Sequence, residues 1–254
     1  MSHVERQGYW NNRWTGEGFG WQNDQALILV ADQVLGGFPG KKTLEVASGR
    51  GVDSLRLAQM GAGAYVADFS RGALEITRLL ASQSKVSIQI TQADAFRLPF
   101  ASNYFDLVFS QGLLEHPGDR EEFLREQVRV VRPGGYVIVD MPNKYCLQTP
   151  IRDVQVLLNL WPQGKEYPMS YWELKGFMEK AGLTPIRAYG WDLLPLLHLG
   201  IRDRMRGKWV QRVDQIKDLP LGDPPRPNFF TRNIEAKIGH WFLNNVGVVG
   251  QKLE

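Results

Sequence analysis

The sequence predicts an α/β fold in which a doubly wound, mostly parallel sheet carries a ligand site along one edge. Short apolar segments alternate with segments of helical periodicity from Thr43 to Asp140, and such alternation is typical of a parallel sheet covered by helices. A glycine-bearing turn and several polar residues follow the ends of the predicted strands. Ligands of such sheets bind beyond the carboxyl ends of the strands, so these residues should share one site.

The elements of this core follow from capping and periodicity. Asp24 caps a predicted helix over Gln25–Leu35, which Gly36 and Gly37 end. We then predict strands beginning at Thr43, Gly63, Val86, Tyr104 and Tyr136, and helices over Val52–Met60, Arg71–Ser84 and Arg120–Val131.

After Pro142 the chain leaves this alternation. Apolar residues at helical spacing predict a helix over Ile151–Trp161, and Ser170 with Glu173 forms a capping box for the next helix. The remaining predicted elements are a strand at Thr184–Tyr189, a helical insertion at Leu193–Asp218, a proline-rich turn at Leu219–Pro227, a helix at Thr231–Leu243 and an antiparallel last strand at Val246–Leu253.

The segment Thr43–Gly51 has the pattern of a loop that binds a nucleotide cofactor. Glycine permits positive φ and close approach of a ligand, and the helix that follows offers free amides to polar ligand groups. Asp68, at the end of the next strand, is suited to accept hydrogen bonds from two ribose hydroxyls. Dehydrogenases use a similar arrangement, and Asp68 next to Ser70 also fits a helix cap.

Three further motifs narrow this reading: Leu98-Pro-Phe100, Phe105-Asp-Leu-Val108 and Val131-Arg-Pro-Gly-Gly135. With them, the chain from Lys41 to Leu183 resembles the class I S-adenosylmethionine-dependent methyltransferases. The resemblance implies a Rossmann-like, seven-stranded sheet, mostly parallel with an antiparallel last strand. It also implies S-adenosylmethionine as cofactor and S-adenosylhomocysteine as product.

One position departs from the family pattern, which usually has glycine where this chain has Ala47. We expect cofactor binding to survive if φ at Ala47 is negative. Arg50 either flanks the methionyl carboxylate or points to solvent.

The resemblance assigns roles to several side chains. Glu45 is expected to brace the glycine turn and the methionyl ammonium, unless it occupies an exposed strand position; Asp94 is expected to hold the adenine amino group. Aromatic rings attract a sulfonium, so the tryptophans near the N-terminus either cover the cofactor or pack on the first helix. The predicted cofactor-binding residues are Trp10, Trp14, Glu45, Ala47, Ser48, Gly49, Gly51, Asp68, Phe69, Asp94, Ala95, Phe96, Ser110 and Gln111.

Catalysis by such an enzyme rests mainly on aligning the two reactants, and a general base is needed only if the nucleophile starts protonated with a high pKa. His116, in a Leu-Leu-Glu-His turn, is the predicted catalytic residue, and a structural role for it is equally open. Glu166, Tyr167 and Tyr171 are further candidates.

Composition sets limits on the class of protein. With 254 residues, of which 43% are hydrophobic, the chain can bury a core as one domain. The chain has a single cysteine, Cys146, and its N-terminal sequence does not predict a secretory signal. Both observations favour a cytoplasmic location. The longest apolar runs are too short to span a bilayer. A net charge of +3 without a dense basic block does not favour nucleic acid, and no residue spacing indicates a metal site.

The predicted function is methyl transfer from S-adenosylmethionine to a small or medium-sized, partly apolar acceptor by in-line displacement. A non-catalytic, cofactor-binding regulatory protein and a nicotinamide-dependent reductase are the alternatives. We expect one domain over residues 1–254, acting alone or as a homodimer. Its expected parts are an N-terminal arm and first helix (1–40), the cofactor-binding core (41–142) and two helical insertions that form a substrate lid (143–170 and 191–245).

Overall fold

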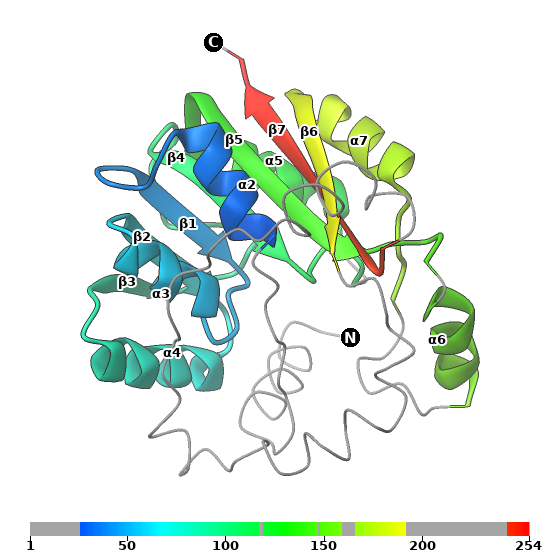
Figure 1. Cartoon of the computed structure of the whole chain (residues 1–254), viewed down its shortest axis with the longest axis horizontal. Coiled ribbons are helices and arrows are strands. Elements are labelled where there is room, and N and C mark those ends of the chain that lie inside the picture. The colour runs from blue at the N-terminus through cyan, green and yellow to red at the C-terminus, as the bar shows by residue number, and fades with distance from the viewer. Residues whose placement is uncertain (1–25, 117–118, 147, 159–165, 192–242, 254) are drawn as a thin grey trace.

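The computed structural model describes residues 26–116, 119–146, 148–158, 166–191 and 243–253, which form a seven-stranded sheet between two layers of helices (Figure 1). The strands are β1 Lys42–Val46, β2 Gly63–Asp68, β3 Ile88–Gln92, β4 Phe105–Gln111, β5 Val131–Pro142, β6 Leu183–Trp191 and β7 Asn245–Lys252. The helices are α2 Ala26–Leu35, α3 Val52–Gln59, α4 Arg71–Ser84, α5 Arg120–Val130, α6 Gln148–Leu157 and α7 Tyr171–Lys180.

The strand order is β3-β2-β1-β4-β5-β7-β6. Strands β1 to β5 pair in parallel, whereas β7 runs antiparallel to both β5 and β6. The order reverses between β1 and β4, and an open α/β sheet binds its ligand at such a switch point. The predicted fold class, with its antiparallel last strand, is confirmed.

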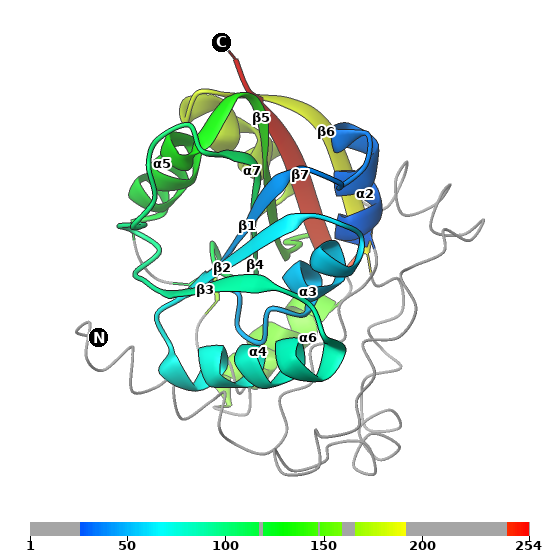
Figure 2. The same cartoon turned by 90° about the vertical axis from the view of Figure 1, so that its left-hand side faces the viewer.

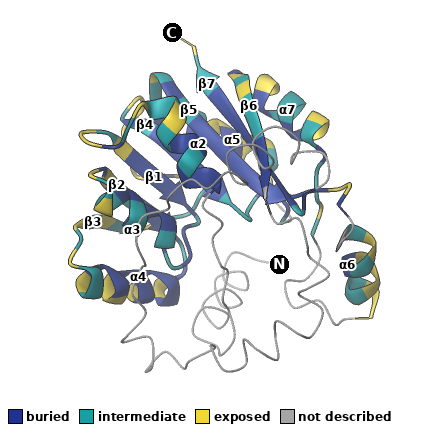
Figure 3. Ribbon diagram, viewed as in Figure 1, coloured by how far each residue is buried: buried dark blue, intermediate teal, exposed yellow. Residues whose placement is uncertain are grey.

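Helices cover both faces of the sheet, as Figure 2 shows. Apolar residues of α2 and α3 pack with Leu107, Phe109 and Ile138 on one face, and α4 extends this layer through contacts with α3 and β3. Residues of α5 and α7, among them Phe123 and Met178, pack on the other face. The strands are therefore largely buried and the outer helix faces exposed (Figure 3), which explains why the core strands read as continuous apolar runs.

Two of the recognised motifs fasten the edge of the sheet opposite the predicted site. The Asp106 carboxylate accepts hydrogen bonds from the Lys42 backbone N–H at 2.8 Å and from Arg132 Nε at 2.9 Å, and so joins β1, β4 and β5. A Cβ atom at Gly135 would lie 2.9 Å from the Asp106 carbonyl oxygen. These motif residues therefore have structural roles in this chain.

Some predicted boundaries are wrong. Val131 was predicted to end a helix but starts β5, because it pairs with Phe105 across the sheet. The helix predicted over Ile151–Trp161 is α6, which begins at Gln148 and ends at Leu157. Trp161, the predicted insertion at 193–218, the turn at 219–227 and nearly all of the helix at 231–243 lie outside the described residues, as do Trp10 and Trp14.

Candidate active site

The turn after β1 needs left-handed backbone at alternate residues. Ala47, Gly49 and Gly51 have φ of 54°, 52° and 61°. The condition of a negative φ at Ala47, under which we expected cofactor binding to survive, is therefore not met. An L-residue in this region costs roughly 1–2 kcal/mol because Cβ crowds the backbone, so alanine adopts the glycine geometry at some cost.

Gly51, which precedes α3, is also required for space. A Cβ atom there would lie 2.9 Å from the Thr77 Cγ2 atom of α4 and 3.3 Å from Val66. The Thr77 hydroxyl donates to the Gly49 carbonyl at 3.2 Å. The turn is thus held tightly against α4, with the first turn of α3 facing the carboxyl edge of the sheet.

Glu45 lies near the end of β1 and is buried, so the alternative of an exposed strand position is wrong. Its carboxylate accepts a hydrogen bond from the Ser54 N–H in the first turn of α3 at 3.1 Å. Burial and the charges of Asp53 and Asp68 raise the pKa of Glu45 to about 8. Glu45 braces α3 and places a carboxyl group that favours a proton or a nearby cation.

Asp68 ends β2 and is buried beside the same turn. Its Oδ2 accepts from the Gly49 N–H and its Oδ1 from the Ser70 N–H, both at 2.8 Å. Ser70, and not Asp68, caps α4. Burial raises the pKa of Asp68 to about 6 despite these hydrogen bonds. A carboxylate offers about four acceptor positions. The backbone N–H groups of Gly49, Ser70 and Phe69 interact with Asp68, so its carboxylate keeps acceptor capacity for a ligand hydroxyl.

The segment after β3 turns tightly at Asp94. Its carboxylate accepts from the Phe96 N–H at 3.1 Å, and its carbonyl accepts from the Arg97 N–H at 2.9 Å. Asp94, Ala95 and Phe96 are half-buried, and the Phe96 ring packs edge-on near Phe123 of α5. The structure thus gives the three predicted residues one short, ordered turn.

At the end of β4, Ser110 is buried and accepts a hydrogen bond from Gln127 at 3.2 Å. Gln111 is half-buried, and its Nε2 has no hydrogen-bond partner in the described part of the chain. Gln111 thus retains a donor for a ligand beside the β1–β4 switch point.

The turn after β4 contains an acid that sequence reasoning missed. Glu115 is buried, and its pKa is raised to about 8 by burial and then by the charge of Glu166. Its Oε2 has no hydrogen-bond partner among the residues described. The segment around Glu166 reaches this turn because the Tyr167 N–H donates to the Glu115 carbonyl at 2.8 Å. The two leucines before Glu115 were the available signal that this turn is buried.

The residues predicted as general bases lie at different places in the structure. His116 is half-buried in the same turn, and its backbone N–H donates to the Leu113 carbonyl. The Glu166 side chain is buried 3.6 Å from Arg152. Tyr171 begins α7, where its ring packs edge-on against Trp172. The structure therefore brings Glu166 and Tyr167 to the Glu115–His116 turn.

Within the described ranges, no group of three or more His, Cys, Asp and Glu residues is arranged to hold a metal ion. None of the described helices is both long and apolar enough to cross a membrane.

A family profile described as "Methyltransferase domain" matches residues 44–139, from β1 to β5. This segment is a methyltransferase domain. It contains the turn after β1, Asp68, Asp94, Gln111 and Glu115. Glu166, Tyr167 and Tyr171 lie beyond the matched residues.

Two relatives of the methyltransferase domain are methyltransferases with quinone-related names. A demethylmenaquinone methyltransferase of Mycolicibacterium paratuberculosis is 39% identical over 105 residues, covering 41% of this chain and 43% of that protein. A ubiquinone biosynthesis O-methyltransferase of Ruegeria pomeroyi is 28% identical over 166 residues, 63% of this chain and 66% of that protein. The chain thus spans less than half the length of the first relative.

Solved structures share the fold of this methyltransferase domain. A possible histamine N-methyltransferase of Thermotoga maritima has a TM-score of 0.60 at 18% identity, covering 98% of this chain and 96% of that one. Phosphoethanolamine N-methyltransferase 2 of Haemonchus contortus, in complex with S-adenosylmethionine, has a TM-score of 0.63 at 17% identity, covering 97% of this chain and 56% of that one. At these identities the likeness establishes the fold alone.

Proposed function

We propose that this protein transfers the methyl group of S-adenosylmethionine to a small or medium-sized, partly apolar acceptor by in-line displacement. The observation that carries the proposal is the pairing of buried Glu45 and Asp68 around the left-handed turn after β1, inside a methyltransferase domain. The cofactor carries an ammonium and a sulfonium, and a nearby cation favours the ionised form of carboxyl groups whose burial otherwise disfavours it.

Each side chain then has a role. Asp68 accepts from the ribose hydroxyls, and Glu45 with the turn residues Ser48 and Gly49 faces the methionyl end. Asp94 accepts from the adenine amino group. The remaining predicted contacts are adenine packing by Phe69, Ala95 and Phe96, a lining of the sulfonium region by Ser110 and Gln111, and an aromatic cover from Trp10 and Trp14.

The residues around the methyl acceptor have little chemistry to perform. Because the sulfonium is already a good leaving group, alignment of the nucleophile with the methyl carbon supplies most of the rate. If the nucleophile is a hydroxyl, its proton passes to a base, and His116 or its neighbour Glu115 is the candidate. The quinone-related names of two relatives support an aromatic, partly apolar acceptor.

The domain layout is part of the proposal. Residues 1–254 form one unit in which 1–40 precede the cofactor core at 41–142, and segments 143–170 and 191–245 close over the acceptor as a lid. The single cysteine supports a cytoplasmic location. A homodimer stays a prediction, which light scattering of the purified protein will test.

The proposal is tested by following methyl transfer from isotopically labelled S-adenosylmethionine. We expect labelling of reduced naphthoquinols or catechols and none of histamine or phosphoethanolamine. Asp68→Ala should lower the rate at limiting cofactor about 100-fold, through loss of hydrogen bonds to a charged acceptor. Glu121→Gln, at an exposed position of α5, is the matched control and should keep wild-type activity.

Two outcomes would redirect the account. Labelling of only the small polar acceptors would reject the apolar substrate class. Tight S-adenosylhomocysteine binding without transfer to any acceptor would favour the regulatory protein over the enzyme.

A further inference from the structure

The segment that carries Asp94 depends on α5 for its shape. Residues 93–104 connect β3 to β4 without forming a helix or a strand of the sheet. Three side chains on successive turns of α5 contact this segment, Phe123 through Phe96 and Glu126 and Arg129 through hydrogen bonds. A single helix face therefore holds the connection in place.

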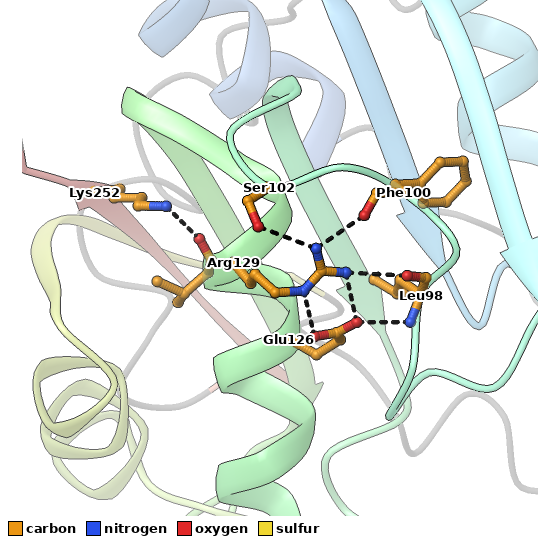
Figure 4. Close-up of polar contacts among 7 residues, drawn as sticks. Leu98, Phe100, Ser102, Glu126, Arg129 and Lys252 are labelled. Carbon is orange, nitrogen blue, oxygen red and sulfur yellow. Dashed lines mark hydrogen bonds and ion pairs between the residues drawn. The ribbon is translucent and has the colours of Figure 1, made fainter.

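Arg129 uses every donor of its guanidinium in this contact (Figure 4). Its Nε and Nη2 donate to the two carboxylate oxygens of Glu126, each at 2.7 Å. Nη2 also donates to the Leu98 carbonyl at 3.0 Å, and Nη1 donates to the Phe100 carbonyl at 2.9 Å and to Ser102 Oγ at 3.2 Å. Lysine cannot reproduce this planar, five-donor pattern.

Glu126 completes the contact from the other side. Its Oε1 accepts from the Leu98 N–H at 2.7 Å, so both backbone polar groups of Leu98 end on the Glu126–Arg129 pair. The hydrogen bond from Arg129 is the main cause that lowers the pKa of Glu126, so Arg129 favours the ionised carboxylate of Glu126. Leu98 itself is buried. The pair thus fixes one backbone position from both its amide and its carbonyl.

Only one turn separates this fixed position from Asp94. The Asp94 carbonyl accepts from the Arg97 N–H, and Asp94 and Arg97 form an isolated antiparallel bridge. The position of the Asp94 turn therefore depends on where the backbone of Leu98 is held.

The end of α5 is anchored in turn by the last strand. Lys252 Nζ donates to the Val128 and Val131 carbonyls at 2.7 and 2.9 Å, and to Asn103 Oδ1 at 2.7 Å. A cation at a helix C-terminus also interacts favourably with the helix dipole. Lys252 therefore holds the end of α5 from which Arg129 extends (Figure 4).

We infer that Arg129, oriented by Glu126, is a positioning residue that holds the Asp94 turn so that the carboxylate meets the adenine amino group of the cofactor. The inference rests on the proposed function, in which Asp94 accepts from that amino group. Arg129 itself contacts neither cofactor nor acceptor in this account. A purely structural role would stabilise the chain without affecting recognition of the base.

The test compares two ligands that differ only in the 6-amino group of the base, S-adenosylhomocysteine and its 6-deamino (unsubstituted purine) analogue, by calorimetric titration of the full-length protein. Wild type should prefer the adenosyl compound by at least about 10-fold, the value of one hydrogen bond to a charged group. Asp94→Asn should lose most of this preference. Arg129→Lys should lose it too, and adding it to Asp94→Asn should change the preference less than twofold.

Arg132→Lys is the matched control, because it weakens an arginine–carboxylate pair, with Asp106, that makes no contact with the Asp94 turn. It should keep the wild-type preference at a comparable loss of melting temperature. Glu126→Gln serves as a second variant if Arg129→Lys does not fold, since it keeps an acceptor for Leu98 while removing the charge.

Folded Arg129→Lys and Glu126→Gln variants with the wild-type preference would overturn the inference and leave the pair a structural contact. A wild-type protein that binds S-adenosylhomocysteine but shows no preference would also overturn it, leaving cofactor binding intact. A wild-type protein that binds neither ligand would remove the proposed function itself.

Discussion

Ala47 stands where the methyltransferases that this chain resembles usually have glycine, and its backbone has a conformation that favours glycine. Its φ of 54° places it in the left-handed region. From the sequence, cofactor binding was expected to survive on the condition that φ at this alanine is negative. The neighbouring contacts of the turn with Asp68 and Thr77 instead hold the geometry, and the alanine accommodates it.

Ala47→Gly should therefore stabilise the protein. Relief of the left-handed strain outweighs the greater freedom of glycine in the unfolded chain, for a net gain of about 0.5–1 kcal/mol. Urea unfolding measures the change. The control is Ala101→Gly, at an exposed loop position without positive φ, which should destabilise by a similar amount. A loss of stability at both positions would contradict the left-handed geometry of Ala47.

The acids around the turn predict how cofactor binding depends on pH. Burial raises the pKa of Glu45 to about 8 and of Asp68 to about 6. Without ligand, the folded state holds protons that the unfolded state releases at lower pH, so these groups reduce stability as pH rises from about 4.5 toward 8. A cationic ligand lowers both pKa values, so its binding releases protons and strengthens as pH rises.

Between pH 6 and 7.5, the Kd for S-adenosylmethionine should fall by about 3- to 10-fold. Titration in buffers of different ionisation enthalpy should detect proton release on binding. Glu45→Gln should remove most of the pH dependence. A Kd that stays constant over this range would mean that the buried acids do not face the cofactor's charges.

At the scale of elements, local signals predicted most of the core. Helix α4 has the predicted bounds because Ser70 caps its start. Helix α6 begins earlier than its apolar periodicity suggested, since Pro150 fits within a first helical turn. The start of β5 depends on pairing with β4, a contact between distant residues that spacing within Arg120–Tyr136 does not reveal.

In the candidate site, too, residues with local signals were predicted, whereas contacts between distant residues were missed. Polar residues at strand ends were found from sequence because strand pattern and motif order locate them. The burial of Glu115 was missed, since it depends on a segment that returns to this turn after α6. The Arg129 contact with Leu98 and Phe100 was missed for the same reason. Residues that act through tertiary contacts leave little trace in local pattern.

At the scale of the whole molecule, the strand order brings the predicted residues together. Strands β1, β2 and β4 are neighbours in the order β2-β1-β4, so Glu45, Asp68 and Gln111 share the carboxyl edge of the sheet. The matched methyltransferase domain ends at residue 139, yet Lys252 on β7 reaches back to α5. The last strand therefore supports the part of the molecule that carries the loops predicted to bind the cofactor.

The central claim is that this edge of the sheet binds S-adenosylmethionine, and calorimetric titration tests it most directly. Wild type should bind S-adenosylmethionine and S-adenosylhomocysteine with micromolar Kd, and NAD much more weakly. Asp68→Ala, checked for folding by its melting temperature, should lose binding of both. Absence of binding by a folded wild type, or tighter binding of NAD, would contradict the account.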